Sequence, residues 1–218
     1  MRLGLFGGSF DPVHLAHLLL AECCREQARL DQVLFLPAAV PPHKRDVTLA
    51  PAEHRLEMLR LAVGGHPALA VSRYEIDRGG VSYTVDTLAH FREEDPTGEL
   101  FLLLGADMLA DLPHWREAAR VCELAVPLVV HRPGAPEPAF KDLSSLASDA
   151  RIALFREHQV EMPPMGLSGT EIRRRVASGW SIRYRVPRAV EKYIHAHGLY
   201  GYPKQKGPTE EPIRRKPE

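Results

Sequence analysis

Short apolar runs alternate with longer amphipathic stretches along most of this chain, and this alternation constrains the fold more than any other feature. Five of the apolar runs are predicted strands, at residues 3–6, 33–36, 69–72, 100–104 and 124–130, with a weaker sixth at 151–155. Helices are predicted between most of them, at residues 13–30, 53–63, 84–92 and 115–123. Nearly continuous apolar strands that alternate with helices form a parallel sheet covered on both faces. We therefore predict an α/β fold with a doubly wound parallel sheet and helices on both faces.

The chain changes character after the proline pair at 163–164, where it becomes helical and basic. Helices are predicted at residues 170–179 and 187–197, and two such short helices bury little apolar surface on their own. We expect this helical C-terminal end, about residues 165–201, to dock on the sheet. A length of 218 residues is enough for one good core, so residues 1–201 are predicted to form one Rossmann-like domain.

The charge balance bears on the kind of partner this chain can have. The net charge is zero, but residues 168–192 contain seven basic and two acidic side chains. A local basic surface on a neutral protein suits a small polyanion better than a long nucleic acid. The alternative is that these residues form a solvated helix face, above all Arg174 and Arg175.

Cysteine content and the ends of the chain bear on its location. Cys23 and Cys24 are adjacent, and three cysteines make a poor disulfide framework, which favours a reducing compartment. The N-terminus enters a strand without a signal-peptide pattern, and no apolar run approaches the roughly 18 residues of a membrane span. We expect a cytoplasmic protein with neither a membrane nor a nucleic acid as partner. Residues 202–218, rich in proline and charge, are predicted to form a disordered tail.

The most informative motif follows the first apolar run: residues 7–17 read Gly-Gly-Ser-Phe-Asp-Pro-Val-His-Leu-Ala-His. A glycine turn leads into a helix, with Asp11 as the expected N-cap and Pro12 as the first helical residue. His14 and His17 are three residues apart, so on a helix they share a face near its positive end. Free backbone N–H groups, the helix dipole and two imidazole donors favour anionic oxygen, and we predict a phosphate site. A zinc site is disfavoured, because a third ligand is missing and the spacing differs from that of helical zinc ligands.

Other polar motifs follow the ends of further predicted strands, which is where parallel sheets bind their ligands. Lys44 ends a stiff Pro-Pro-His-Lys stretch that would hold its ammonium group beside a phosphate. Thr84 stands at a predicted helix start, where the hydroxyl or free N–H groups suit a carboxylate or an amide. Gly105 allows close approach of the backbone, and the carboxylate of Asp107 suits a ribose diol.

Two more segments have both a structural and a functional interpretation. Trp115 offers a flat surface for an aromatic ring, although a tryptophan is more often a core residue; its short distance from Asp107 in sequence favours the functional interpretation. Ser168 or Thr170 can cap the following helix and leave its other N–H groups for a triphosphate. Arg173, one turn into that helix, has a guanidinium fork that fits phosphate oxygens. An ordinary capped helix with a surface arginine is the alternative.

Together these motifs resemble the nicotinate-nucleotide adenylyltransferases of bacteria, over roughly residues 2–201. The segments that carry the resemblance are residues 7–17, Pro-Pro-His-Lys at 41–44, His-Arg-x-x-Met at 54–58, Ser-Tyr-Thr-x-Asp-Thr-Leu at 82–88, Gly-Ala-Asp at 105–107, Leu-Pro-x-Trp at 112–115, Arg-Pro-Gly at 132–134, Ser-x-Thr-x-Ile-Arg at 168–173 and the end of the region at 186–200. The chain departs from the family at Gly169, where serine or alanine is common, and at Arg116, where an aromatic residue is common.

The resemblance implies transfer of AMP from ATP to nicotinate mononucleotide, giving deamido-NAD and pyrophosphate by in-line attack without a covalent enzyme intermediate. It implies that the catalytic residues are His14, His17 and Arg173. The implied ATP-binding residues are Gly7, Gly8, Ser9, Phe10, His14, His17, Gly105, Asp107, Ser168, Thr170 and Arg173. The implied residues for nicotinate mononucleotide are Lys44, Thr84, Trp115 and Arg132. Mg²⁺ is expected to arrive with ATP, bound mainly through phosphates and without protein ligands of its own.

Several alternatives stay open on the sequence. The acceptor could instead be nicotinamide mononucleotide or phosphopantetheine. The chain could also be a nucleotide-binding module without turnover, an alternative that the intact histidine and arginine motifs disfavour. A homo-oligomer is compatible with the sequence, which does not fix the number of subunits.

Overall fold

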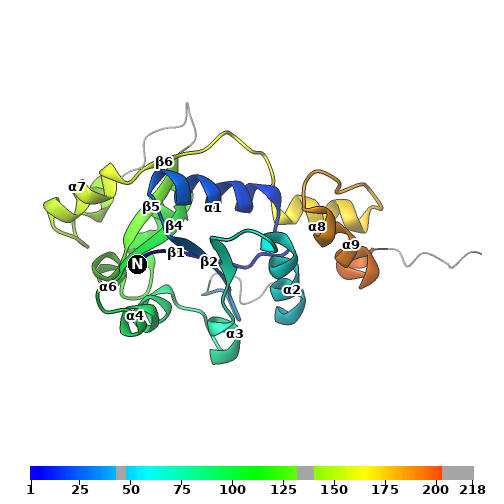
Figure 1. Ribbon diagram of the computed structural model, residues 1–218, viewed down its shortest axis with the longest axis horizontal. Coiled ribbons are helices and arrows are strands. Elements are labelled where there is room, and N and C mark those ends of the chain that lie inside the picture. The colour runs from blue at the N-terminus through cyan, green and yellow to red at the C-terminus, as the bar shows by residue number, and fades with distance from the viewer. Residues whose placement is uncertain (43–47, 132–139, 203–218) are drawn as a thin grey trace, which may run out of the picture.

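Six strands form the centre of the protein, described by a computed structural model for residues 1–42, 48–131 and 140–202 (Figure 1). The strands are β1 (Arg2–Gly8), β2 (Gln32–Pro37), β3 (Leu69–Val71), β4 (Glu99–Gly105), β5 (Val126–His131) and β6 (Val160–Glu161). All neighbours are parallel, in the order β3-β2-β1-β4-β5-β6. The direction of winding reverses between β1 and β4, so a ligand crevice is expected at the carboxyl ends of these two strands. The predicted doubly wound, Rossmann-like α/β sheet is confirmed.

Helices flank this sheet on both faces. They are α1 (Leu15–Gln27), α2 (Ala52–Val63), α3 (Tyr74–Arg78), α4 (Thr84–Glu94), α5 (Ala106–Asp111), α6 (Ala118–Leu124), α7 (Asp149–Glu157), α8 (Gly169–Ala177) and α9 (Arg188–Ala196), with short 3₁₀ turns at Leu112–His114, Phe140–Leu143 and Leu199–Gly201. Helix α1 lies on one side of the sheet, and α4 and α6 lie on the other (Figure 1). The C-terminal α8 and α9 lie together at one end of the molecule, where α9 packs on α2. The helical end was expected to dock on the sheet, but it packs on α2 through α9.

Burial on both faces explains the nearly continuous apolar strands. Every residue of β4 from Leu100 to Leu104 is at most 5% exposed. Gly4 in β1 sits so close to its neighbours that an added Cβ would lie 2.7 Å from Leu30 and 3.0 Å from Leu103. A larger residue at this position of the central strand would force these leucine side chains to move, so glycine allows the close packing seen here.

Two predicted elements differ from the structure. Residues 151–155 were expected to form a strand but lie within α7, whose N-cap Ser148 accepts a hydrogen bond from the Arg151 N–H. Ile152 and Phe155, three apart, are buried on one face of that helix, and the sixth strand follows at β6. The helix expected from Trp115 begins only at α6, because Glu117 has a left-handed backbone with φ of 51°. Trp115 therefore lies in the connection before the helix.

The remaining general predictions concern cysteines and membrane contact. Cys23, Cys24 and Cys122 are all free thiols. Within residues 1–42, 48–131 and 140–202, no helix combines the length and the apolar character needed to cross a membrane. The predicted tail, 202–218, lies outside the described residues except for Tyr202.

Candidate active site

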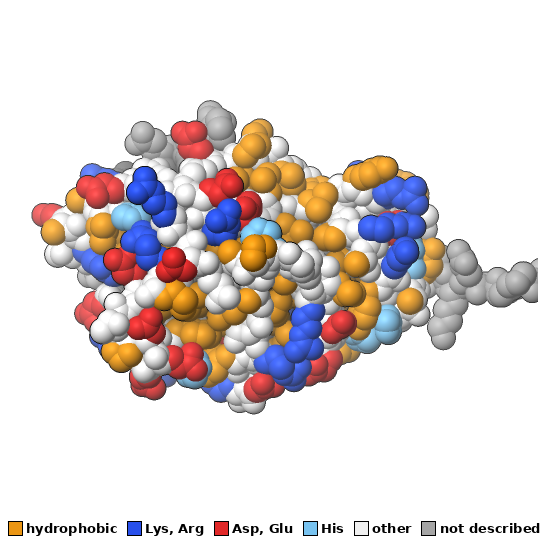
Figure 2. Space-filling view, viewed as in Figure 1, with side chains coloured by type: hydrophobic (Ala, Val, Ile, Leu, Met, Phe, Trp, Pro, Cys, Tyr) orange, Lys and Arg blue, Asp and Glu red, His pale blue; other side chains and the backbone are white. Residues whose placement is uncertain are grey.

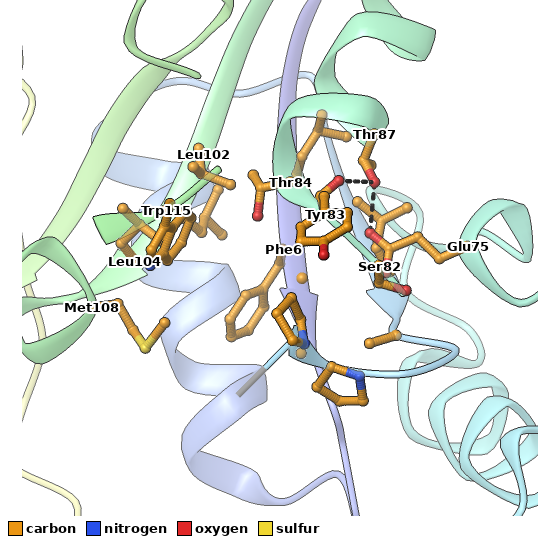
Figure 3. Close-up of a pocket in the computed structure, with 18 of the residues that line it drawn as sticks. Phe6, Glu75, Ser82, Tyr83, Thr84, Thr87, Leu102, Leu104, Met108 and Trp115 are labelled. Atoms are coloured by element: carbon orange, nitrogen blue, oxygen red, sulfur yellow. Dashed lines mark hydrogen bonds between the residues drawn. The ribbon is translucent and has the colours of Figure 1, made fainter. Parts of the chain in front are cut away.

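A cavity of about 730 Å³ lies at the carboxyl ends of β1, β2 and β4, where the strand order predicts a ligand (Figure 3). Apolar side chains form much of its lining, among them Phe6, Leu102, Leu104, Met108 and Trp115. Polar lining residues come from α3, from the start of α4 and from the connection before α6: Glu75, Ser82, Tyr83, Thr84, Thr87 and Arg116. A largely apolar pocket with a few convergent polar groups is typical of a site for a small organic molecule.

The loop after β1 borders this cavity but enters its helix later than the sequence predicts. Helix α1 begins at Leu15 with His14 as the N-cap residue, so the expected N-cap Asp11 and first helical residue Pro12 were wrong. The carboxyl group of Asp11 is used elsewhere. Its Oδ1 accepts hydrogen bonds from the Tyr200 hydroxyl at 2.7 Å and from the Ala50 N–H at 3.3 Å. A carboxylate held by those distant groups cannot also cap α1.

The two histidines of the motif stack on one another. Their ring centroids are 3.6 Å apart with an angle of 14° between the planes. The backbone N–H of His14 donates to Nδ1 of His17 at 3.2 Å, so the proton of the His17 ring is on Nε2. His17 lines the cavity, and its Nε2–H is therefore a donor for a bound anion.

His14 differs from His17 in its burial and in its position relative to the cavity. His14 is 5% exposed. Desolvation by burial lowers its pKa to about 4, so its imidazole ring is neutral at pH 7. It does not belong to the residues that line the cavity. The two imidazoles therefore do not project from one helix face as equal donors. The neutral ring of His14 stacks on the ring of His17 and restricts its orientation.

The N-terminus of α8 packs against the same loop. The Ser168 hydroxyl is its N-cap, accepting from the Glu171 N–H at 3.2 Å. A Cβ added at Gly169 would lie 2.8 Å from the carbonyl oxygen of Asp11, which accounts for a residue without a side chain there. Arg173 donates from Nη1 to that carbonyl at 2.6 Å and from Nη2 to the Thr170 hydroxyl at 3.3 Å. The structure thus brings Arg173 to the loop that contains both histidines.

The two arginines that follow Arg173 contact Glu171 and Trp180 and not the loop. Figure 2 shows Lys and Arg side chains over the α8 end of the molecule. Arg174 pairs with Glu171 at 2.8 Å, and the guanidinium groups of Arg174 and Arg175 lie 5.5 Å and 5.3 Å from the ring centroid of Trp180. The interpretation as a solvated helix face agrees with the structure for Arg174, whereas the side chain of Arg175 is 19% exposed and donates to the carbonyl oxygen of Ser181.

A buried arginine and a C-terminal tyrosine, to which the sequence assigned no role, hold the loop. Arg55 is 1% exposed and donates to the carbonyl oxygens of Ser9 and Ala50, both at 2.9 Å. Burial lowers the pKa of its guanidinium, and the carboxyl group of Asp11 opposes this shift. Tyr200 reaches Asp11 from the opposite end of the chain. Sequence spacing alone cannot place either residue against the loop.

Across the cavity, polar contacts fix the start of α4 and the indole. Thr84 is the first residue of α4, and the extended Tyr83 precedes it. Glu75, another residue without an assigned role, accepts a hydrogen bond from the Thr87 hydroxyl at 2.7 Å, and its burial raises its pKa (Figure 3). The Trp115 indole N–H donates to Asp111 at 3.1 Å, which holds the ring in the lining.

The structure places most of the predicted site residues around this cavity and loop. Those that line the cavity are Gly7, Gly8, Ser9, Phe10, His17, Thr84, Gly105 and Trp115. Those that lie outside its lining are His14, Asp107, Ser168, Thr170 and Arg173. Lys44 and Arg132 lie outside the described residues. Among the residues that the structure describes, no three His, Cys, Asp or Glu side chains form a set able to hold a metal ion.

Comparison with known proteins gives one consistent family. A model of the cytidylyltransferase-like proteins matches residues 5–175. A probable nicotinate-nucleotide adenylyltransferase of Thermus thermophilus is 51% identical over 200 residues, which is 92% of this chain and 100% of the relative. A relative of the same description in Thermomicrobium roseum is 46% identical, with 91% of each chain covered.

A solved structure has the same fold. It is the nicotinic acid mononucleotide adenylyltransferase of Plasmodium falciparum complexed with NaAD, with a TM-score of 0.69 and 16% identity, covering 92% of this chain and 98% of that one. At this identity the likeness concerns the fold alone.

Proposed function

The chain belongs to the nicotinate-nucleotide adenylyltransferase family, within the cytidylyltransferase-like proteins, and we propose that it transfers AMP from ATP to nicotinate mononucleotide. The products are deamido-NAD and pyrophosphate, so this nucleotidyltransferase acts in NAD biosynthesis. The observation that supports the proposal best is the position of Arg173. Its guanidinium contacts the loop of the two histidines, and other residues of this loop line the same cavity as Trp115.

In the proposed reaction, an oxygen of the mononucleotide phosphate attacks the α-phosphorus of ATP. A new P–O bond forms while the bond to the β-phosphate oxygen breaks, and pyrophosphate leaves with that electron pair. No covalent enzyme intermediate is needed. Catalysis of this kind depends on positioning and on stabilising charge that develops on the phosphate oxygens.

We assign the phosphates of ATP to the loop of residues 7–17 and to the start of α8. Nε2–H of His17 donates to an α-phosphate oxygen, and the neutral His14 ring holds His17 in that orientation. Arg173 binds the leaving pyrophosphate with the N–H groups that Asp11 and Thr170 do not occupy. Gly105 and Asp107, which follow β4, bind the adenosine.

We assign the acceptor to the apolar cavity. The pyridine ring stacks on Trp115, whose orientation the Asp111 hydrogen bond fixes. The N–H groups at the start of α4, beside Thr84, face the substituent on that ring. Lys44 and Arg132, which the family resemblance assigns to the same substrate, complete this part of the proposal.

We treat Mg²⁺ as part of the MgATP substrate. Asp11 is the carboxylate of the phosphate loop; Tyr200 and Ala50 donate to its Oδ1, and its Oδ2 lies 3.7 Å from Nη1 of Arg173. A metal bound through phosphate oxygens and water fits this arrangement better than one bound by protein carboxylates. The three free thiols fit a reducing compartment, and we propose a cytoplasmic location.

Pyrophosphate release in the presence of MgATP and one acceptor at a time tests the proposed function. Nicotinate mononucleotide, nicotinamide mononucleotide and phosphopantetheine are compared at matched concentrations. We expect the largest kcat/KM with nicotinate mononucleotide. Tight ATP binding without pyrophosphate release for any acceptor would refute the enzymatic proposal and favour a non-catalytic nucleotide-binding module.

A further inference from the structure

Charged groups around the cavity are few, and their signs differ. Among the lining residues that the structure describes, Arg116 is the one with a permanent positive charge. Two acidic residues, Glu75 and Asp111, also line the cavity. An acceptor with a carboxylate and a phosphate brings further negative charge into this space, so the placement of Arg116 bears directly on which acceptor binds.

Both acidic lining residues are engaged by neighbours in the wall of the cavity. Glu75 accepts hydrogen bonds from the hydroxyls of Thr87 and Ser82, and its burial raises its pKa. Asp111 accepts from the indole N–H of Trp115. These contacts orient the two carboxyl groups toward wall residues. Neither acid forms an ion pair with Arg116, whose acidic neighbours are different residues.

The guanidinium of Arg116 contacts an aromatic ring and lies near two carboxylates. Its guanidinium carbon lies 4.7 Å from the centroid of the Tyr83 ring. Its nearest carboxylate oxygens, on Glu117 and Asp86, are 3.5 Å and 4.0 Å away. Asp86 instead pairs at 2.8 Å with Arg78. The Arg116 side chain is therefore placed by stacking on Tyr83 and by two long ion pairs, and neither of these carboxylates accepts a hydrogen bond from it.

Neighbouring residues put this guanidinium beside the predicted ring site. Arg116 follows Trp115 in sequence, and Tyr83, on which it stacks, precedes Thr84. All four residues line the same cavity. The indole, the start of α4 and the guanidinium thus border one region, in which a substituent on a stacked ring meets a cation and helix N–H groups.

We propose that Arg116 is a specificity-determining residue that favours an acceptor with a ring carboxylate over one with a carboxamide. This inference rests on the proposed function. A carboxylate gains a charge-assisted hydrogen bond and Coulomb attraction from the guanidinium, whereas a neutral carboxamide gains neither to the same extent. The N–H groups at the start of α4 can donate to one oxygen of either substituent, whereas the full positive charge of the guanidinium matches only the carboxylate.

The test compares Arg116→Gln with wild type, measuring kcat/KM for nicotinate and nicotinamide mononucleotide at saturating ATP. Because Arg116 is about half exposed, we expect roughly a tenfold loss for the acid, corresponding to one lost charge-assisted hydrogen bond that is partly screened by water. The value for the amide and the KM for ATP should change less than threefold. Calorimetric binding of each acceptor to the free protein gives the same ratio when amide turnover is too slow to measure.

Arg120→Gln is the matched control, because Arg120 is similarly exposed, pairs with Glu123 at 2.8 Å and does not line the cavity. It should leave both acceptors unchanged. An unchanged acid-to-amide ratio in Arg116→Gln, or an equal loss for both acceptors, would overturn the inference. A wild-type protein without pyrophosphate release for either acceptor would instead refute the proposed function, and this inference with it.

Discussion

The contact between Tyr200 and Asp11 joins the C-terminal end to the phosphate loop, and Tyr200→Phe removes it with little change in shape. The hydroxyl donates to Oδ1 at 2.7 Å, leaving the Ala50 N–H at 3.3 Å as the remaining donor to that oxygen. Oδ2 of Asp11 is buried without a hydrogen-bond partner. A hydrogen bond to a carboxylate contributes about 1.5–3 kcal/mol, so the substitution should lower the free energy of unfolding by about 2 kcal/mol. For a chain of this size that lowers Tm by about 4–8 °C.

The same substitution should affect ATP more than the acceptor. Asp11 also accepts, through its backbone carbonyl, the hydrogen bond from Arg173. A less firmly held Asp11 should raise the KM for ATP severalfold, because Arg173 is then held less precisely relative to the loop. The KM for nicotinate mononucleotide should change less than twofold.

Thermal denaturation followed by circular dichroism and steady-state pyrophosphate release give the two readouts. Tyr184→Phe is the control, since Tyr184 is 84% exposed. If Tyr200→Phe lowers Tm by less than 1 °C, or no more than Tyr184→Phe does, the hydrogen bond does not anchor the loop and the reasoning is refuted.

Two further predictions concern His14 and Trp115. Burial lowers the pKa of His14 from 6.5 to about 4, so the unfolded chain binds this proton at a higher pH than the folded protein does. The wild type should therefore lose about 3 kcal/mol of unfolding free energy relative to His14→Asn between pH 7.5 and 4. Urea denaturation at several pH values measures this, and parallel curves for both proteins would contradict the buried neutral ring. Trp115→Ala should raise the KM for nicotinate mononucleotide about tenfold and the KM for ATP little, since loss of one stacked aromatic contact costs about 0.5–1.5 kcal/mol beyond its buried area. Equal increases for both substrates would mean that Trp115 is a packing residue.

Features that depend on local pattern could be predicted from the sequence. The apolar run 100–104 is buried because it lies in a central strand with helices on both sides, so its composition alone identifies it. Thr84 begins its helix as predicted. Residues Gly7 to Phe10 line the cavity because the loop after a central strand lies at the ligand edge of a parallel sheet.

Features that depend on distant partners could not be predicted in this way. Asp11 is a residue type that often caps helices, but its carboxyl group accepts a hydrogen bond from Tyr200, 189 residues later. Arg55 and Glu75 are charged residues that composition assigns to the surface, and their burial depends on carbonyl and hydroxyl partners from other segments. Helix α6 starts later than predicted because its N-cap residue, Glu117, has a left-handed backbone, and nothing in the sequence around this glutamate predicts that conformation.

Turnover of His17→Ala with saturating MgATP and nicotinate mononucleotide tests the central claim most directly, since His17 lines the cavity and its Nδ1 accepts from the His14 N–H, which leaves the ring proton on Nε2. Loss of one such donor to a developing charge costs about 3–4 kcal/mol, so we predict a fall in kcat of about 10²–10³. His66→Ala, at a surface histidine that pairs with Glu22, should keep wild-type turnover. A folded His17→Ala protein that releases pyrophosphate at a near-normal rate would contradict the account.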